Sequence, residues 1–204
     1  MLVKTYGCAL YGINAVKVTV EVNIEQGVNF FMVGLPDSAV KESHQRIEAA
    51  LRYIGYRIPG KKVVINMAPA DIKKEGSSYD LALAIGILGA SEQLPATRIG
   101  DYVIMGELSL DGGIVPMKGA LPIAIEAKRK GFKGLILPLV NAREAAIVEG
   151  IDVLGIENIR EIIDFFKGTG AISPVKVNIE EEFFRNLNIP FNAFNCYLIE
   201  SRFI

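Results

Sequence analysis

The chain has 204 residues, 50% of them hydrophobic, and a formal net charge of -1. This composition supports one hydrophobic core, or one domain with an appendage, and it excludes a global basic field that would attract nucleic acid or an anionic membrane. Any such binding would have to be local. The two cysteines, Cys8 and Cys196, match no metal-ligand spacing, and no apolar run approaches the roughly 20 residues of a membrane span. We expect a reduced, cytoplasmic protein without membrane association.

The first elements are two predicted strands and a helix. Residues 15–24 alternate apolar and polar side chains, which indicates a strand with one face on a core. Residues 29–33 form a second strand, which we expect to pair with the first as a hairpin or meander. A helix then begins with Asp37 or Ser38 as its cap and ends at Gly55.

The second half of the chain contains a hairpin followed by regular alternation. Two apolar runs, 103–110 and 114–116, are joined by Asp111-Gly112-Gly113, a strong turn signal because glycine supplies positive φ. Alternation indicates parallel pairing through right-handed crossovers, so we predict a mixed α/β fold. The alternating elements are helix 119–130, strand 135–137, helix 141–148, strand 153–154 and helix 158–167.

We place one domain at 1–168 and a divergent tail at 169–204. The periodicity fades beyond Gly170, and the end of the chain is rich in aromatic residues. This tail is either a strap packed on the domain or a segment that binds a partner. Its aromatic residues are Phe183, Phe184, Phe191, Phe194, Tyr197 and Phe203.

The segment Lys73–Asp80 joins a predicted strand at 63–67 to a predicted helix at 81–88 through a glycine and two serines. A hydroxyl at a helix start either caps the helix or, when a lysine activates it, attacks a substrate. Ser77 and Ser78 are the candidates for both roles. Which role they have decides whether the chain is an enzyme.

A serine-lysine dyad is the only nucleophilic option, because the single histidine, His44, lies on the apolar stripe of its helix. Lys118 is the natural candidate base for Ser78, and it would have to lose its proton near neutral pH through burial. Tyr79 and Asp80 oppose this chemistry, since they place bulk and negative charge directly after Ser78. The residues alone leave both interpretations open.

A phosphate or metal site has weaker support. Gly55–Lys62 nearly matches a P-loop, yet Lys62 stands where the magnesium-binding hydroxyl belongs. The segment also follows a helix and opens a strand, the reverse of the P-loop context, so we interpret it as a turn. The candidate acidic residues fit no metal motif and are expected to be caps and turn residues: Asp71, Glu75, Asp80, Glu107 and Asp111.

The densest basic cluster lies at the end of the helix at 119–130, where cations complement the helix dipole and solubilise the surface. The alternative is contact with DNA phosphates, which requires further basic residues nearby. The candidate DNA contacts are Lys61, Lys62, Lys73, Lys74, Lys128, Arg129, Lys130 and Lys133.

Several sequence blocks together resemble the N-terminal domain of the magnesium-chelatase-like AAA+ proteins known as ComM or YifB. The resemblance covers about residues 1–168 and implies a fold similar to the proteolytic domain of Lon protease. The blocks are Tyr11-Gly12, Val33–Asp37, Val64–Asp71, Lys74–Leu81, Gly106–Gly112 and Gly119–Pro122.

The resemblance to Lon implies a degenerate site. The Lon nucleophile motif overlays Lys74–Asp80 and places its serine at Ser78, whereas the position of its lysine corresponds to Leu121. Leucine cannot act as a base, so the resemblance implies a retained scaffold without peptidase chemistry. Lys118, one helical turn earlier, remains the only candidate base.

ComM-like proteins resemble hexameric helicases that act in DNA branch migration during natural transformation. This resemblance implies a non-catalytic accessory domain that contributes to homo-oligomer assembly and contacts DNA. A residual serine-lysine peptidase using Ser78 and Lys118 is the alternative. We expect no cofactor in this chain, because ATP and magnesium belong to an ATPase segment that does not occur before Ile204.

Overall fold

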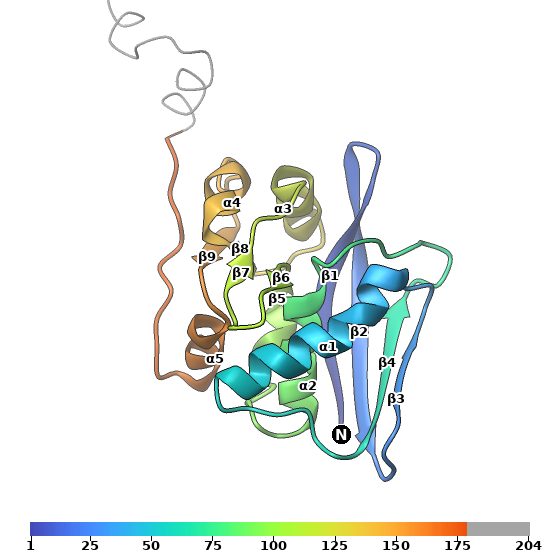
Figure 1. Cartoon of the computed structure of the whole chain (residues 1–204). Coiled ribbons are helices and arrows are strands. Elements are labelled where there is room, and N and C mark those ends of the chain that lie inside the picture. Colours follow the sequence, from blue (N-terminus) through green and yellow to red (C-terminus); the bar gives the residue numbers. More distant parts are fainter. Residues whose placement is uncertain (179–204) are drawn as a thin grey trace, which may run out of the picture.

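A computed structural model describes residues 1–178. Its centre is a seven-stranded mixed sheet with the order β3-β4-β2-β1-β5-β8-β9, and helices pack against it (Figure 1). The α/β class is therefore confirmed. The strands of this sheet are β1 (Leu2–Tyr11), β2 (Asn14–Glu25), β3 (Phe30–Val33), β4 (Lys62–Ala68), β5 (Tyr102–Ile104), β8 (Gly134–Pro138) and β9 (Asp152–Ile156).

The N-terminal half of the sheet is built around a long hairpin. Strand β1, which the sequence pattern did not predict, pairs antiparallel with β2 from Leu2↔Asn23 to Tyr11↔Asn14. The tip of this hairpin projects from the domain (Figure 1). Strand β3 pairs parallel with β4 and not with β2, so the expected hairpin or meander is wrong. The physical reason is the crossover helix α1 (Ser38–Tyr53), which carries the chain from β3 back to a parallel neighbour.

Helix α1 begins as predicted. The Asp37 carboxylate accepts a hydrogen bond from Val40 N–H at 2.8 Å, and Gly55 follows the helix with φ +87°. His44 stacks on Phe30 with ring centroids 4.1 Å apart, which fits its position on the inner side of the helix. His44 does not line the cavity that contains Ser78.

The C-terminal half of the sheet is parallel, as predicted. Strand β5 pairs with β8 and β8 with β9, and the hairpin of β6 (Glu107–Leu108) and β7 (Ile114–Val115) forms a separate small sheet. The remaining elements are α2 (Asp80–Ala90), the 3₁₀ turn Ile99–Asp101, α3 (Ala120–Arg129), α4 (Leu139–Ala145) and α5 (Ile159–Lys167).

Helix α2 forms the centre of the core. Every residue from Asp80 to Ala90 is buried, because the helix is apolar on all sides and packs on β1, β2 and α1. Gly86 allows close contact with β2, since a Cβ atom there would meet Val22 Cγ2 at 2.7 Å. The core thus rigidly fixes the helix that follows the segment Lys73–Asp80.

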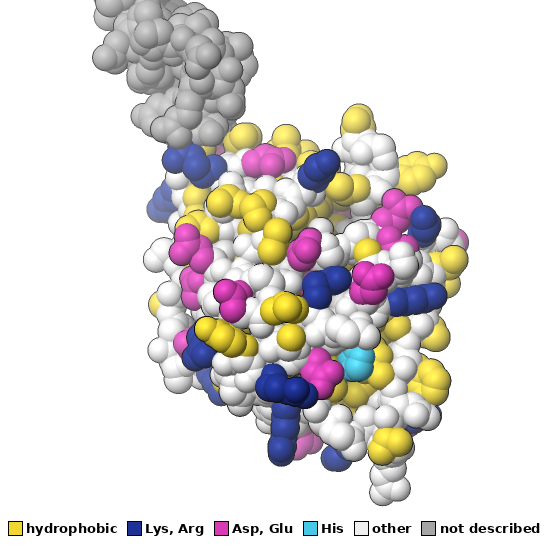
Figure 2. All heavy atoms as spheres, viewed as in Figure 1, with side chains coloured by type: hydrophobic (Ala, Val, Ile, Leu, Met, Phe, Trp, Pro, Cys, Tyr) yellow, Lys and Arg dark blue, Asp and Glu magenta, His cyan; other side chains and the backbone are white. Residues whose placement is uncertain are grey.

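Acidic and basic side chains are interspersed on the face shown in Figure 2, with no large patch of one sign. Gly168 ends α5, and Val175 N–H donates to Val153 O at 2.8 Å. The aromatic residues of the tail, 183–203, lie outside the described residues. Within residues 1–178, no helix is long and apolar enough to cross a membrane.

Candidate functional site

The segment between β4 and α2 is tied to the β3–α1 loop through backbone hydrogen bonds. Lys74 N–H donates to Leu35 O at 3.2 Å, and Asp37 N–H donates to Lys74 O at 3.0 Å. Gly34 approaches β4 so closely that a Cβ atom would meet Met67 O at 2.1 Å, and its φ of +97° also favours glycine. The glycine of the Val33–Asp37 block therefore permits the contact that positions the segment.

Lys74 is fully buried in the junction between this segment and the β3–α1 loop. Its ammonium donates to Gly34 O at 2.8 Å and to Pro69 O. Burial lowers the pKa of Lys74, and the nearby Asp71 carboxylate opposes that effect. A buried ammonium bound to two carbonyls cannot reach a phosphate, so the prediction that Lys74 contacts DNA is wrong.

Neither serine caps α2. The Ser77 hydroxyl donates to the Glu107 carboxylate, while Leu81 N–H donates to Gly106 O at 3.0 Å and Gly106 N–H donates to Ser78 O at 2.7 Å. The expected serine cap is wrong because the Gly106 carbonyl serves the start of the helix instead. The Ser78 hydroxyl has no hydrogen-bond partner among residues 1–178.

Asp80 belongs to the core rather than to a reaction site. Its side chain is 1% exposed and accepts two hydrogen bonds from Arg46, at 2.7 and 3.0 Å, and one from Leu108 N–H at 3.3 Å. Hydrogen bonding to Asp80 raises the pKa of Arg46. Arg46 also donates to Ala39 O at 2.9 Å. The pair joins α1, α2 and β6, so the Asp80 carboxylate, which follows Ser78 closely in the sequence, does not line the cavity that contains Ser78.

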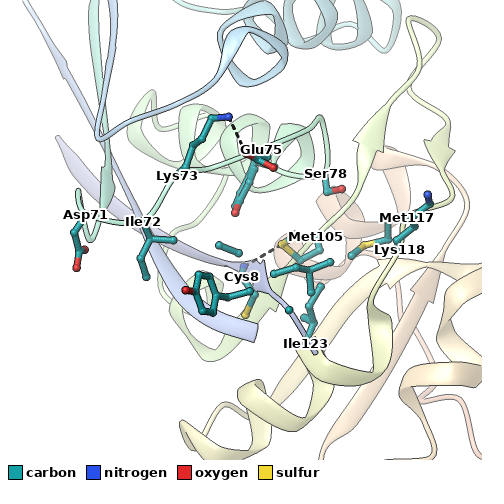
Figure 3. A pocket seen from close by; sticks show the side chains of 15 residues that line it. Cys8, Asp71, Ile72, Lys73, Glu75, Ser78, Met105, Met117, Lys118 and Ile123 are labelled. Atoms are coloured by element: carbon teal, nitrogen blue, oxygen red, sulfur yellow. Dashed lines mark hydrogen bonds and ion pairs between the residues drawn. The ribbon is translucent and has the colours of Figure 1, made fainter. Parts of the chain in front are cut away.

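A cavity of about 560 Å³ lies where the segment meets β1 and the start of α3 (Figure 3). Its walls combine apolar and sulfur-containing side chains with a few polar ones, and both Ser78 and Lys118 contribute to it. Cys8–Gly12, from β1 and its turn, line one side, and further lining residues include Asp71, Ser78, Met105, Met117, Lys118 and Ile123.

Two lining residues are mainly structural. Tyr79 is 2% exposed and packs over Gly7, where an added Cβ atom would meet the ring at 3.2 Å. Burial raises the pKa of Tyr79. Cys8 is also 2% exposed, and burial, with a smaller effect of Glu126, raises its thiol pKa to about 12. Neither group is ionised near neutral pH, so neither supplies a nucleophilic anion.

Ser78 and Lys118 share the cavity without forming a dyad. No hydrogen bond joins them within the described part of the chain, and Figure 3 shows their side chains at separate points of the lining. Lys118 is exposed, whereas a lysine base is normally desolvated. Leu121 does not line the cavity, and its N–H donates to the Glu144 carboxylate at 3.0 Å.

The predicted basic residues do not converge on one surface. Lys61 lies just before β4 and Lys62 is its first residue, whereas Lys73 lies beyond the opposite end of the strand. Several of the set are already paired: Lys62 with Glu25 at 2.7 Å, Lys73 with Glu75 at 2.7 Å, and Arg129 with Glu126 at 2.6 Å. Lys61, Lys128, Lys130 and Lys133 form no ion pair among residues 1–178, so their ammonium groups remain available to bind an anion.

Two of these lysines border a second hollow of about 350 Å³. Lys130 and Lys133 meet Lys17 of β2 there, beside Tyr6 and Asp101. The Lys17 ammonium lies 5.3 Å from the centroid of the Tyr6 ring. Lys17 could not be predicted from the sequence pattern, because only the pairing of β1 with β2 and the packing of α3 on β2 bring it to the end of that helix.

The P-loop-like segment connects α1 to β4 in the structure, and the Lys62 ammonium pairs with Glu25. This arrangement does not fit a phosphate loop, which opens a helix. Within residues 1–178, no three His, Cys, Asp or Glu side chains form a group that could hold a metal ion. The apolar wall of the first cavity could not be predicted from the sequence either, because Met105, Met117 and Ile123 carry no local chemical signal.

Comparison with known proteins reveals relatives along most of the chain. Over 169 residues the chain is 40% identical to the uncharacterized protein YifB of Escherichia coli K12, covering 82% of this chain and 33% of that protein. It is 36% identical over 182 residues to the competence protein ComM of Haemophilus influenzae, covering 89% of this chain and 35% of ComM. The chain thus spans about a third of the length of these relatives.

A more distant similarity links the chain to a protease. Over 130 residues it is 32% identical to Lon protease 2 of Bacillus subtilis, which covers 62% of this chain and 23% of the protease. The family described as subunit ChlI of Mg-chelatase matches residues 20–141. The matched region is more than half of the chain, so the chain belongs to this family, with YifB and ComM among its similar proteins.

Proposed function

We propose that this chain is a non-catalytic, Lon-like accessory domain of a ComM/YifB-type protein. The observation that carries the proposal is the state of the cavity: the Ser78 hydroxyl has no base bound to it, Lys118 is exposed, and position 121 is a leucine. A nucleophilic serine needs a positioned, deprotonated base. The domain therefore contributes through binding and assembly within DNA processing and natural transformation, in the cytoplasm.

The absence of peptidase activity is tested with fluorescein-labelled casein, an unfolded substrate. We expect no cleavage above the rate of a mock purification, and no difference between wild type and Ser78→Ala. Cleavage that disappears in Ser78→Ala while the variant keeps its fold by circular dichroism would refute the proposal.

A contribution to oligomer assembly is supported by the tip of the β1–β2 hairpin. Tyr11 is 77% exposed and Ile13 90% exposed, and the tip projects from the domain (Figure 1). Exposed apolar side chains on a projecting element are typical of protein contacts. Light scattering after gel filtration should give a mass above 22.2 kDa for wild type. Ile13→Ser should lower this mass, whereas Val28→Ser, an equally exposed residue at 86%, should not. A monomeric wild type at high concentration contradicts the assembly role.

A DNA contact is supported by the three lysines around the second hollow, Lys17, Lys130 and Lys133, which come from two separate parts of the chain and form no ion pairs within residues 1–178. Titration of labelled DNA at several salt concentrations should give an affinity that falls as salt rises, because bound lysines release counterions. The charge-removing change Lys133→Gln should weaken binding and reduce the salt slope, while Lys61→Gln should leave both unchanged. No binding at low salt excludes this role.

The alternative function is a residual serine-lysine peptidase, favoured only by the presence of Ser78 and Lys118 in one cavity. It predicts that casein cleavage depends on both side chains. Loss of activity in Lys118→Met, with retention in Lys73→Met, would support this alternative over the accessory role.

A further inference from the structure

Strand β1 extends beyond its neighbour β5. The ladder between them consists of Tyr6 opposite Val103, and past this point Cys8 N–H donates to the Met105 sulfur at 3.2 Å. From Ala9 to Tyr11, β1 pairs with β2 alone. This part of the strand therefore has one edge without a neighbouring strand in the described chain.

The register shows which main-chain groups lie on that edge. The hairpin closes through the two residues after Tyr11, so the Tyr11↔Asn14 pair is hydrogen-bonded and the pairs alternate from there. Leu10 then falls at a non-hydrogen-bonded position opposite β2, and its N–H and C=O point away from β2. The bond from Cys8 N–H, two residues earlier on the same side, agrees with this assignment.

The free edge runs along the cavity. Cys8 to Gly12 line it on one side, and its deep wall is apolar, with Met105, Met117 and Ile123 at most 9% exposed. Figure 3 shows Asp71 and Lys118 at opposite ends of the lining. Neither the Lys118 ammonium nor the Ser78 hydroxyl has a partner within residues 1–178. The cavity thus presents main-chain donors and acceptors, an apolar wall and a free cation together.

We propose that an extended peptide segment of another polypeptide binds here by adding a strand beside Leu10. Its main chain would bond to Leu10 N–H and C=O, and alternate side chains would point into the cavity. Methionine side chains adapt to different apolar groups, so the wall accepts a bulky apolar residue. Lys118 complements an acidic residue at one end. Binding of this kind needs no catalytic base and no self-assembly, so it goes beyond the accessory role proposed above.

The shape of the site favours a short extended segment over a second copy of the domain. A cavity of about 560 Å³ is within the usual size of ligand pockets and accommodates a few side chains. The stretch of β1 that lacks a second neighbouring strand, Ala9–Tyr11, is also short, so it suits a short extended segment better than the longer edge of a folded sheet. The occupant is therefore a peptide with a bulky apolar residue and, two positions later, an acidic one.

The first test measures fluorescence anisotropy with the fluorescein-labelled hexapeptide Gly-Val-Phe-Val-Glu-Gly and the full chain. A matched peptide, N-methylated at Phe and at the following Val, keeps the side chains but blocks strand pairing in either register. We expect saturable binding of the first peptide and binding of the methylated one weaker by about tenfold or more. Equal binding of both peptides, or no binding at millimolar concentration, overturns the proposal.

The second test locates the peptide by amide hydrogen exchange. Exchange at Leu10 should slow when the peptide is added, whereas Ala9, already bonded to β2, should change little. An unchanged Leu10 rate in a peptide-saturated sample overturns the assignment of the edge. If Leu10 is already protected without peptide, and dilution of the protein releases that protection, the edge is occupied by a second copy and the proposal is wrong.

The third test reverses charge. Lys118→Glu should weaken binding of the peptide that contains Glu and strengthen binding of the same peptide with Glu replaced by Lys. Misfolding cannot produce such a reversal of preference. Lys61→Glu, a matched change at an exposed site outside the cavity, should leave the preference unchanged. Loss of binding to both peptides in Lys118→Glu, with an intact fold by circular dichroism, contradicts the proposed role of the lysine.

Discussion

Two neighbouring regions differ in how their polar groups are used. One is the buried junction that the segment Lys73–Asp80 forms with α1 and the β3–α1 loop, and the other is the cavity beside it. In the junction, Lys74 and Asp80 are fully engaged by carbonyls and by Arg46. In the cavity, Ser78 and Lys118 are unengaged. The segment Lys73–Asp80 thus contains residues that hold the fold and one residue, Ser78, whose side chain is free to meet a ligand. Resemblance to an enzyme motif therefore does not reveal which residues remain functional.

The largest expected effect concerns Cys8, which lines the cavity but belongs to its buried wall. A thiol pKa of about 12, against an ordinary 9.0, lowers the thiolate fraction at pH 8 by about a thousandfold. Iodoacetamide should therefore react with Cys8 far more slowly in the folded Cys196→Ser variant than in the same protein in urea. Similar reaction rates in the folded protein and in urea would show that the Cys8 thiol is accessible from the cavity.

Arg46→Leu should most strongly disturb the buried junction. The change leaves the Asp80 carboxylate buried without its cation, so we expect the free energy of unfolding to fall by about 3 kcal/mol in denaturant titrations. The matched control is Arg52→Leu, which removes an exposed pair with Glu48 on the same helix and should cost at most about 0.5 kcal/mol. Equal losses in the two variants would show that Asp80 does not depend on its partner.

Lys74→Met should reduce stability by about 2 kcal/mol at neutral pH, because two buried carbonyls lose their donor. The wild-type pKa of Lys74 is lowered by burial, so the unfolded chain binds more protons than the folded one between that lowered value and 10.5. Wild-type stability should therefore gain a contribution from this residue as pH rises through this window.

The pH dependence separates Lys74 from its neighbour. Lys74→Met should lose this contribution, so the difference from wild type grows toward pH 10.5, whereas Lys73→Met at an exposed position should keep the wild-type profile. Denaturant titrations at successive pH values measure both. Parallel profiles for wild type and Lys74→Met would contradict a lowered pKa at Lys74.

The smallest effects are expected in the cavity. Ser78→Ala and Lys118→Met remove groups that have no partner in the described chain, so each should change the free energy of unfolding by less than about 0.5 kcal/mol. A loss comparable to that of Arg46→Leu in either variant would show that the cavity residues also support the fold.

The predictable parts of the fold were those with strong local patterns. The alternation at 15–24, the cap at Asp37, the turn at Asp111–Gly113 and the parallel C-terminal half all appear in the structure. Strand β1 was missed because Gly7, Cys8 and Ala9 interrupt its strand-forming residues, and its conformation depends on pairing with β2. The parallel pairing of β3 was also missed, because no local pattern records which strand lies next to it.

The sequence by itself determined the α/β class, the family resemblance and the position of Ser78 at a strand-to-helix corner. Only the tertiary structure decided what each residue of that corner does, because burial and pairing depend on distant partners. Arg46, 34 positions before Asp80, makes that carboxylate structural, and Gly34 and Pro69 enclose Lys74. Likewise, the free edge at Leu10 exists because β1 is longer than β5 and extends beyond it. These two strands are far apart in the chain, so no local pattern predicts the difference.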